Sequence, residues 1–599
     1  MPLVCDAVNF VRRTTEIVKS LLLSAPIRLS CLLAICVSGG SATAQSLEVA
    51  QVRPPDTRGI EPPSQQPLPT PEIETLPSPD QLLPATPTPT PGDRPDVDAP
   101  QEITVRGFTI TGSTVFSQEQ MLRAIEKKIG PIPPEGKKIS LNQLFEARTA
   151  ITELYTENEY ITSGAFIPPQ KLQDGQVEIR VVEGSLEDIQ VLGTKDLKPG
   201  YISSRLGLAT QTPLNRSKLL EALQLLQLNP LIETISAELS AGSRPGTSLL
   251  QVTVTEADSA SATFTFDNQR VPSVGTLRGQ IQGVEQNLLG YGDTISLAFT
   301  KTEGSNALDF GYTIPVSPRN TTISFNAGFS ASDVIEAPFD ILDIHSESNY
   351  FEITGRHPLI QTPTTDLAVG LTFGRRSTQT DLLDEIPFPS PGADTEGRTT
   401  ETVARFFQEY TKRSSQSVFA LRSQFNFGLD ALNSTVNEEP PDTRFFSWRL
   451  QGQWVRLLAP DMLLLVRSDL QLANKPVLPI EQFGLGGALN LRGYRQDLLL
   501  TDNGLSGSAE LRIPILRLPK QQALLQATPF VDLGRGWNNG DFADPDPGFL
   551  ASLGVGLRLQ VGNNFTARMD FGFPLVDVDS AKNTLQEKGI YFSIIYTPF

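Results

Sequence analysis

The stretches LGVGLRLQV at Leu553–Val561 and FTARMDFGF at Phe565–Phe573 alternate between two kinds of side chain. A β-strand turns successive side chains to opposite faces, so each stretch has one apolar and one polar face. The apolar faces are Leu553, Val555, Leu557, Leu559 and Val561, and then Phe565, Ala567, Met569, Phe571 and Phe573. The polar faces carry Arg558, Gln560, Arg568 and Asp570. Such alternation over ~10-residue segments is typical of a transmembrane β-barrel with a wet lumen.

The same alternation recurs upstream, at 322–329, 367–373 and 464–472. Strands of a soluble β-sandwich also alternate, but they usually have only about 5–6 residues. Residues 258–599 number 342. At ~10 residues per strand plus turns and loops, about sixteen strands are expected, and about fourteen or eighteen fit almost as well. We therefore predict a mostly β protein whose residues 258–599 form a transmembrane antiparallel β-barrel.

Residues 1–44 are typical of a cleaved secretory signal peptide. The short apolar run Leu29–Val37 follows several basic residues and precedes small residues at 42–44. The mature chain would then have no disulfide and no thiol nucleophile, because all the cysteines lie in this segment: Cys5, Cys31 and Cys36. Removing the segment moves the net charge from −18 to −20. This acidic balance argues against nucleic acid as a partner, which requires a basic surface.

Residues 45–101 are predicted to be a proline-rich linker, with fifteen prolines between Arg53 and Gln101. Such a tract favours extended polyproline II structure and is not expected to form a core. We expect a semi-rigid spacer.

Residues 102–184 and 185–257 each show the order strand, helix, helix, strand, strand, which predicts two copies of one α+β unit. In the first unit, Ser117 and Gln120 have the spacing of a capping box, and a single strand is expected over Ile103–Ile110. In the second unit, Asn215 is expected to cap the longer helix.

Nothing in the sequence indicates an enzyme. The two histidines, His345 and His357, lack the partners that a metal site or a histidine-based triad would need. The glycine-rich stretch Gly484–Leu489 lacks the last glycine of a dinucleotide-binding motif, and no GxxxxGK[ST] motif occurs. We predict no catalytic residue, no metal and no cofactor.

Motifs in the first unit and at the start of the barrel resemble those of a known protein family. The first unit contains ITSGAFIPPQ at Ile161–Gln170, DGQV at Asp174–Val177 and VEG at Val182–Gly184. It resembles the first POTRA domain of TpsB transporters of the ShlB/FhaC/HecB type, the outer-membrane half of two-partner secretion. FDN at Phe266–Asn268 and NLLGYGD at Asn287–Asp293 are similar to the opening hairpin of the barrel in that family.

Two further motifs resemble those of the wider Omp85 superfamily: LRGY, which is Leu491, Arg492, Gly493 and Tyr494, and FxDxG, which is Phe530, Asp532 and Gly534. The resemblance implies that Arg492 lies on a loop folded into the lumen and forms a salt bridge with Asp532 on the barrel wall. Gly493 would permit a turn and Tyr494 would supply a packing ring. The alternative is that both charges are ordinary lumenal residues. The short plug helix of the family is not clearly present.

The implied function is secretion of an unfolded exoprotein (a TpsA-like passenger) through the barrel, after periplasmic POTRA domains bind it by β-augmentation. Outer-membrane lipid and the barrel-assembly machinery are the other expected partners, and the expected location is the outer membrane. The alternatives are an Omp85-type assembly or insertion factor, a passive channel, or an adhesin.

Overall fold

A computed structural model describes residues 63–71, 73, 77–84, 102–383, 386–388, 390–578 and 583–599. The expected signal peptide lies outside these residues, as does much of the proline-rich linker. Within the described ranges, no helix is both long enough and apolar enough to cross a membrane.

The first α+β unit has the predicted element order with two additional short strands. Its elements are β1 (Ile103–Val105), β2 (Gly107–Thr111), α3 (Gln118–Ile129), β3 (Lys137–Ile139), α4 (Leu141–Glu157), β4 (Gly164–Phe166) and β5 (Gln176–Val182). The capping box of Ser117 and Gln120 is confirmed. The single strand predicted over Ile103–Ile110 is wrong, because β1 pairs with β3 whereas β2 pairs in parallel with β5. The chain changes sheets at Arg106, whose amide donates to the Gly175 carbonyl at 2.7 Å.

The second unit repeats the order with β6 (Ser185–Leu192), α5 (Pro199–Gly207), α6 (Arg216–Gln227), β7 (Ile232–Ala241) and β8 (Thr247–Glu256). Its strands lie in the order β6-β8-β7, and Asn215 caps α6 as predicted. A short helix from the proline-rich linker, α2 (Pro79–Leu82), packs on α6 and β7. The expectation that the linker takes no part in a core is wrong for Leu82 and Leu83, which are buried in the core of this unit.

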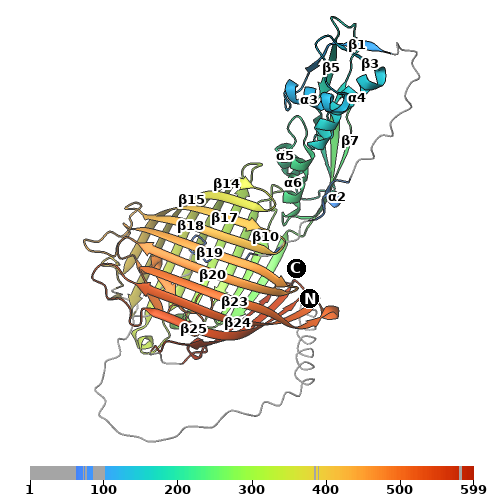
Figure 1. The fold of residues 1–599 in the computed structure, drawn as a ribbon. Helices are drawn as coiled ribbons and strands as arrows, with labels where there is room; N and C mark the ends of the chain where they lie inside the picture. The colour runs from blue at the N-terminus through green and yellow to red at the C-terminus, as the bar shows by residue number, and fades with distance from the viewer. Residues whose placement is uncertain are drawn as a thin grey trace. The chain divides into compact units, whose positions relative to one another are not determined.

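Sixteen longer strands form a closed antiparallel barrel, and the two-residue β16 (Ile386–Pro387) pairs at the end of β15 (Figure 1). The sixteen are β9 (Ala260–Asp267), β10 (Arg278–Glu285), β11 (Thr294–Lys301), β12 (Ser305–Pro315), β13 (Thr322–Asp333), β14 (Ile344–Gln361), β15 (Thr365–Leu382), β17 (Arg398–Arg413), β18 (Ser417–Gly428), β19 (Phe446–Ala459), β20 (Met462–Ala473), β23 (Asn503–Leu518), β24 (Ala523–Trp537), β25 (Phe549–Val561), β26 (Phe565–Pro574) and β27 (Ile590–Tyr596). The barrel closes where β27 pairs with β9. The predicted number of about sixteen is confirmed.

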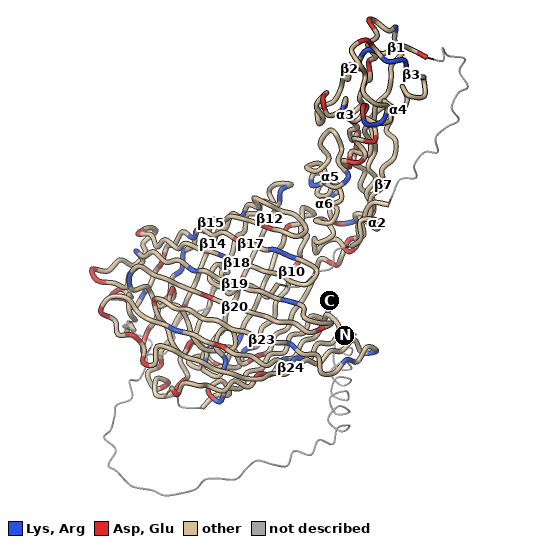
Figure 2. Tube along the Cα trace, in the orientation of Figure 1, with Lys and Arg blue, Asp and Glu red and all other residues tan. Residues whose placement is uncertain are grey.

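The faces of the strands distinguish this barrel from a soluble sandwich. Leu553, Val555 and Leu557 on β25 are 45%, 45% and 47% exposed, whereas the polar Asp570 on the neighbouring β26 is 4% exposed. A soluble protein would bury the apolar face, and a membrane barrel turns it towards lipid. In Figure 2 the barrel strands are mostly uncharged, and acidic residues gather in the loops at one rim. The predicted transmembrane barrel is confirmed.

The connection between β20 and β23, residues 474–502, folds into the barrel and contacts its inward-facing side chains. We call it the lumenal loop. It contains a small sheet of β21 (Phe483–Leu485) and β22 (Leu499–Thr501). An apolar cluster within the barrel contains Phe483, Leu485, Leu491, Tyr494, Leu499 and Leu550.

Candidate functional site

The structure brings together the two sequence motifs that lie about forty residues apart in the chain. Leu491, Arg492 and Tyr494 are buried in the lumenal loop. On β24, Phe530, Asp532 and Gly534 face inward, and the intervening Val531 and Leu533 face outward. The period of two along β24 therefore places all three FxDxG residues opposite the loop.

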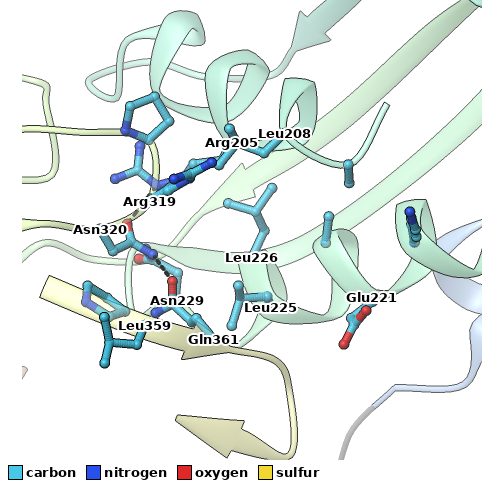
Figure 3. Close-up of a pocket in the computed structure, with 15 residues that line it drawn as sticks. Arg205, Leu208, Glu221, Leu225, Leu226, Asn229, Arg319, Asn320, Leu359 and Gln361 are labelled. Atoms are coloured by element: carbon cyan, nitrogen blue, oxygen red, sulfur yellow. Dashed lines mark hydrogen bonds between the residues drawn. The ribbon is translucent and has the colours of Figure 1, made fainter. Parts of the chain in front are cut away.

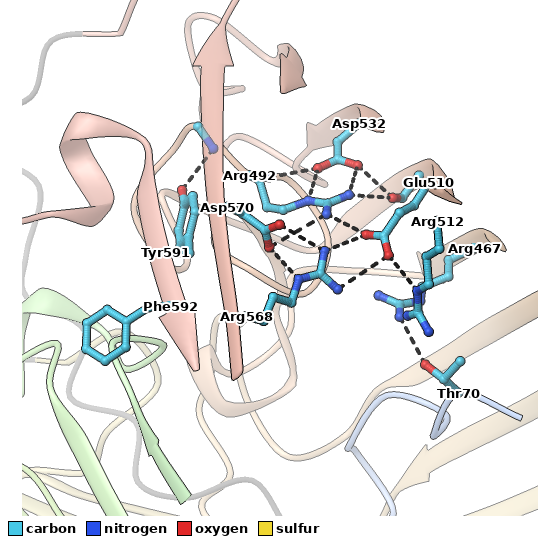
Figure 4. A network of polar contacts seen from close by, with 12 residues as sticks. Thr70, Arg467, Arg492, Glu510, Arg512, Asp532, Arg568, Asp570, Tyr591 and Phe592 are labelled. Atoms are coloured by element: carbon cyan, nitrogen blue, oxygen red, sulfur yellow. Dashed lines mark hydrogen bonds and ion pairs between the residues drawn. The ribbon is translucent and has the colours of Figure 1, made fainter. Parts of the chain in front are cut away.

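Arg492 and Asp532 form a two-pronged ion pair (Figure 4). The guanidinium Nε donates to Asp532 Oδ2 at 2.9 Å, and Nη2 donates to Oδ1 at 2.9 Å. The Arg492 amide also donates to Oδ2, at 3.0 Å. Both residues are nearly inaccessible, with 3% and 1% exposure. Charge-assisted, bidentate bonds fix orientation as well as distance, so this pair sets the position of the loop against β24.

The other residues of the FxDxG motif also contact the loop. The Phe530 ring lies under the guanidinium of Arg492, 3.4 Å from Cζ to the ring centroid. A Cβ added at Gly534 would lie 2.7 Å from Cδ1 of Leu491 and 2.8 Å from Cδ2 of Leu485. The motif therefore supplies a cation–π surface, an anion and space for the loop's leucines.

Gly493 and Tyr494 fix the loop on its other side. Gly493 has φ +102°, and an added Cβ would come within 3.2 Å of the Pro574 backbone nitrogen. Its amide donates to the Tyr591 hydroxyl at 2.9 Å. The Tyr494 hydroxyl donates to the Ala551 carbonyl at 2.8 Å. Glycine is favoured here because an L side chain would be strained at this φ and its Cβ would press tightly against β26.

Sequence analysis missed the remaining members of the charge cluster. Glu510 on β23 accepts from Arg492 Nη1 at 2.7 Å and from Arg568 Nη2 at 2.5 Å. Arg568 also donates to Asp570, and Arg512 donates to Glu510. Three arginines thus face three carboxylates, which offsets the cost of burying each charge. Arg568 and Asp570 were recognisable as lumenal by alternation, but sequence does not show that β26 and β23 share an arginine.

The lumenal loop is also held at other places around the barrel. Arg405 on β17 donates to Glu481 of the loop at 2.6 Å, and both are buried. Arg495 forms a pair with Glu336, in the connection after β13, at 2.7 Å. The loop therefore spans the lumen from the β23–β26 wall to β17 and the β13–β14 connection.

A second segment, residues 63–71 of the proline-rich linker, also occupies the lumen. Arg449 Nη1 donates to the Gln65 carbonyl at 3.1 Å, and Arg467 Nη2 donates to Thr70 Oγ1 at 3.0 Å. Gln453 donates to the Leu68 carbonyl. The expected spacer therefore enters the barrel in this described part, where residues 63–65 form a turn and residues 67–71 have no regular secondary structure.

In the first α+β unit, the VEG motif has a structural role. Glu183 accepts from the Thr114 amide at 2.7 Å and from the Tyr155 hydroxyl at 2.8 Å. Burial raises the pKa of the Glu183 carboxyl, but these hydrogen bonds outweigh it and hold the pKa below its usual value. The carboxylate thus ties α4 and the turn after β2 to the end of β5.

The second α+β unit contacts the barrel around a cavity of about 370 Å³ (Figure 3). Arg205 on α5 stacks on Tyr201, 3.5 Å from Cζ to the ring centroid, and its Nε donates to Asn320 Oδ1 at 2.9 Å. Asn320 in turn donates to Gln361 at 2.8 Å. These bonds join α5 to the turn that follows β12 and to the last residue of β14.

The model of the haemolysin secretion/activation protein family ShlB/FhaC/HecB matches residues 246–559, more than half of the chain. The chain belongs to this family. A model of the ShlB-type POTRA domain also matches residues 103–184. The resemblance to TpsB transporters is confirmed.

Two curated relatives match this chain over similar lengths. The chain is 22% identical over 493 residues to the heme/hemopexin transporter protein HuxB of Haemophilus influenzae. This match covers 77% of this chain and 82% of HuxB. The chain is 24% identical over 521 residues to the outer membrane transporter CdiB of Escherichia coli. This match covers 84% of this chain and 83% of CdiB.

Solved structures share the fold. The CdiB structure from Escherichia coli superposes with TM-score 0.63 at 20% identity, covering 85% of this chain and 93% of CdiB. BamA from Haemophilus ducreyi, lacking POTRA domains 1–3, gives TM-score 0.50 at 15% identity and covers 83% and 100%. The ShlB/FhaC/HecB chain is therefore an outer-membrane transporter of a two-partner secretion system with an Omp85-type fold. Its relatives in the family are transporters rather than enzymes.

Proposed function

We propose that the chain binds an unfolded exoprotein in the periplasm and passes it through the barrel lumen to the cell exterior. The observation that carries this proposal is that the lumenal loop occupies the barrel and is joined to its wall by polar contacts, chiefly the Arg492–Asp532 pair, beside the apolar cluster around Leu491 and Leu499. Once the loop undocks, its hydrogen-bonding groups and those of the wall can bond to water or to another chain.

The α+β units supply a site for an unfolded chain. In the sheet β2-β5-β4 and in the sheet β6-β8-β7, each outer strand pairs with another strand on one side only within the described part of the chain. An extended segment can add to such an edge through main-chain hydrogen bonds, which place little demand on sequence. We propose that residues 102–184 and 185–257 are two periplasmic POTRA domains that receive the exoprotein.

The rest of the chain has supporting roles in this proposal. Residues 1–44 direct export, residues 45–101 are the linker, and residues 258–599 form the barrel, which the barrel-assembly machinery inserts among outer-membrane lipids. The apolar outward faces of the strands fit a lipid environment. We propose that the chain itself catalyses no reaction and uses no cofactor, because folding of the exoprotein outside the cell can draw it through.

Assembly of other barrels is the second candidate, and the likeness to BamA in fold favours it. The ShlB-type POTRA match at residues 103–184 favours secretion instead. A passive channel has no use for α+β units with free sheet edges.

Photo-crosslinking in living cells tests the proposal. Ser506 and Leu505 are neighbours on β23, but Ser506 faces the lumen with 4% exposure whereas Leu505 faces outward with 48%. A photoreactive amino acid at Ser506 is expected to capture one large exported polypeptide, and the same group at Leu505 is expected to capture none. Equal capture at both positions, or capture of many barrel proteins, would overturn the proposal.

A further inference from the structure

The cavity between the second α+β unit and the barrel has an unbalanced positive charge. It is lined by Arg205 on α5, Lys218 on α6 and Arg319 in the turn after β12, and of its described lining residues only Glu221 is acidic. Lys218 and Glu221 lie three residues apart on α6, so they share one face of the helix and their charges offset each other. Arg205 and Arg319 remain, and neither forms an ion pair with a carboxylate in the described part of the chain.

The two arginines belong to the same end of the cavity. Arg205 Nε donates to Oδ1 of Asn320, the chain neighbour of Arg319, and Arg205 Nη1 donates to the Tyr201 carbonyl at 2.9 Å. Figure 3 shows both arginines at one end of the cavity and Glu221 at the other. Burial lowers the pKa of the Arg205 guanidinium, because the cation loses water without gaining an anion. An anionic ligand at this end would offset the cost of burying that charge.

Another wall of the cavity is apolar and continues onto the outside of the barrel. Leu208 and Leu359 line the cavity and are 44% and 57% exposed. β14 has a bulge at Leu359, which is left unpaired between Pro358 and Ile360. Ile360 is 46% exposed, and Ile353, farther along β14, is 55% exposed. The apolar wall therefore leads from the cavity to the face of the barrel that contacts lipid.

A phospholipid matches this combination of arginines and apolar surface. Its phosphate is an anion that guanidinium groups bind with paired hydrogen bonds, and its acyl chains need an apolar surface that leads into the membrane. The cavity of about 370 Å³ lies near the lower end of the range for small-molecule sites, about 300–1,000 Å³, so it has room for a headgroup but not for the chains. The unpaired arginines favour a lipid of net negative charge, because they repel the ammonium group of a zwitterionic headgroup.

We propose that this cavity binds the headgroup of one anionic phospholipid from the membrane leaflet on the side of the α+β units. The phosphate lies between Arg205 and Arg319, and the acyl chains run along Leu359 and Ile360. Since Arg205 belongs to α5 and Arg319 to a turn of the barrel, the bound lipid joins the second unit to the barrel. The inference requires the barrel to lie in a membrane, but it does not depend on the proposed passage of an exoprotein.

The first test counts lipids bound to the purified full chain in detergent by native mass spectrometry. The wild type is expected to bind one phosphatidylglycerol in preference to phosphatidylcholine. Arg319 is exposed, so Arg319→Gln should leave the fold intact, and it is expected to weaken phosphatidylglycerol binding about tenfold. The matched control is Lys412→Gln, which removes an exposed cation from β17 at the same end of the barrel, where Lys412 pairs with Thr365. The control is expected to bind like the wild type.

Three outcomes of this test would overturn the proposal. Equal binding of the two lipids by the wild type would remove the preference for an anionic headgroup. Equal weakening by Arg319→Gln and Lys412→Gln would indicate attraction to the rim in general. Soluble glycerol phosphate that displaces the lipid at equal concentration would show a site for a free anion, to which the apolar wall contributes nothing.

The second test asks whether the lipid joins the second unit to the barrel. Amide hydrogen exchange of α5, residues 199–207, is measured on the full chain in nanodiscs of phosphatidylcholine with and without phosphatidylglycerol. Phosphatidylglycerol is expected to slow exchange in the wild type and in Lys412→Gln, but not in Arg319→Gln. Exchange that is the same in both membranes for the wild type would overturn the joining role. Neither test contains an exoprotein, so failure of the secretion function would leave both results standing.

Discussion

Replacing Arg492 by alanine is expected to release the lumenal loop from the barrel wall without unfolding the barrel. The side chain makes two bonds to Asp532 at 2.9 Å and one to Glu510 at 2.7 Å, and it is almost completely buried. Its removal leaves Asp532 buried without its cation. The strand ladder of β24 with β23 and β25 stays intact, so the cost falls on docking of the loop.

The free-energy cost of removing Arg492 follows from the charged residues that surround it. Removing one partner of a buried ion pair costs about 3–5 kcal/mol. Arg568 and Arg512 remain beside Glu510, so the lower end applies, about 3 kcal/mol. At about 1.4 kcal/mol per tenfold change, the ratio of undocked to docked loop rises about 100-fold.

A buried cysteine reports this ratio. The chain from residue 45 onwards contains no cysteine, so one introduced thiol is unique. Leu499 on β22 is 2% exposed in the lumenal cluster, and Leu499→Cys should react with a bulky maleimide only when the loop undocks. Adding Arg492→Ala is expected to raise the labelling rate about 100-fold. Arg517→Ala, which removes an exposed ion pair on the same strand as Glu510, is the control. A rate within about threefold of the control would refute the assigned role of Arg492.

Three further outcomes are expected. Gly534→Ala should loosen the loop by about 1–3 kcal/mol because its Cβ meets two leucines, whereas Gly279→Ala, with no atom within 4 Å of the added Cβ, should not change Leu499→Cys labelling. Hydrogen bonds from Ser243 and Thr247 lower the pKa of Glu187 from 4.5 to about 2, so their stabilisation of the β7–β8 hairpin is present above pH 4.5 and is lost as the pH falls towards 2. The protection factors of residues 240–248, which compare amide exchange with its intrinsic rate at each pH, should therefore fall over that range in the wild type, but not in Glu187→Gln. Finally, Asp532→Ala should reduce exoprotein in the medium at least tenfold while the heat-modifiable mobility of an inserted barrel persists; full secretion would show that the pair is not needed.

The faces of the barrel strands could be predicted because a period of two is a local property. Alternation over Leu553–Val561 assigned Leu557 to one face and Arg558 to the other, and the outward leucine is 47% exposed in the structure. The lengths could not be predicted in the same way. β14 and β15 each have 18 residues, beyond the ~10 that cross lipid, because strands can continue past the membrane.

The site was predictable only where a motif carried it. The structure places Arg492 against Asp532, the pairing that the resemblance implied. The partnership with Glu510 was not predictable, because it depends on β23, β24 and the loop meeting in space. The position of residues 63–71 was likewise hidden, since prolines and glutamines indicate an extended chain but not where it lies.

The most direct test of the central claim compares the proteins in the medium and on the cell surface with and without this gene. The account predicts that deletion removes one large secreted protein and that wild-type chain, but not the Asp532→Ala chain, restores it. Loss of many outer-membrane barrels together would contradict the account and indicate assembly, and an unchanged set of proteins while the exoprotein is expressed would contradict it in favour of a passive channel.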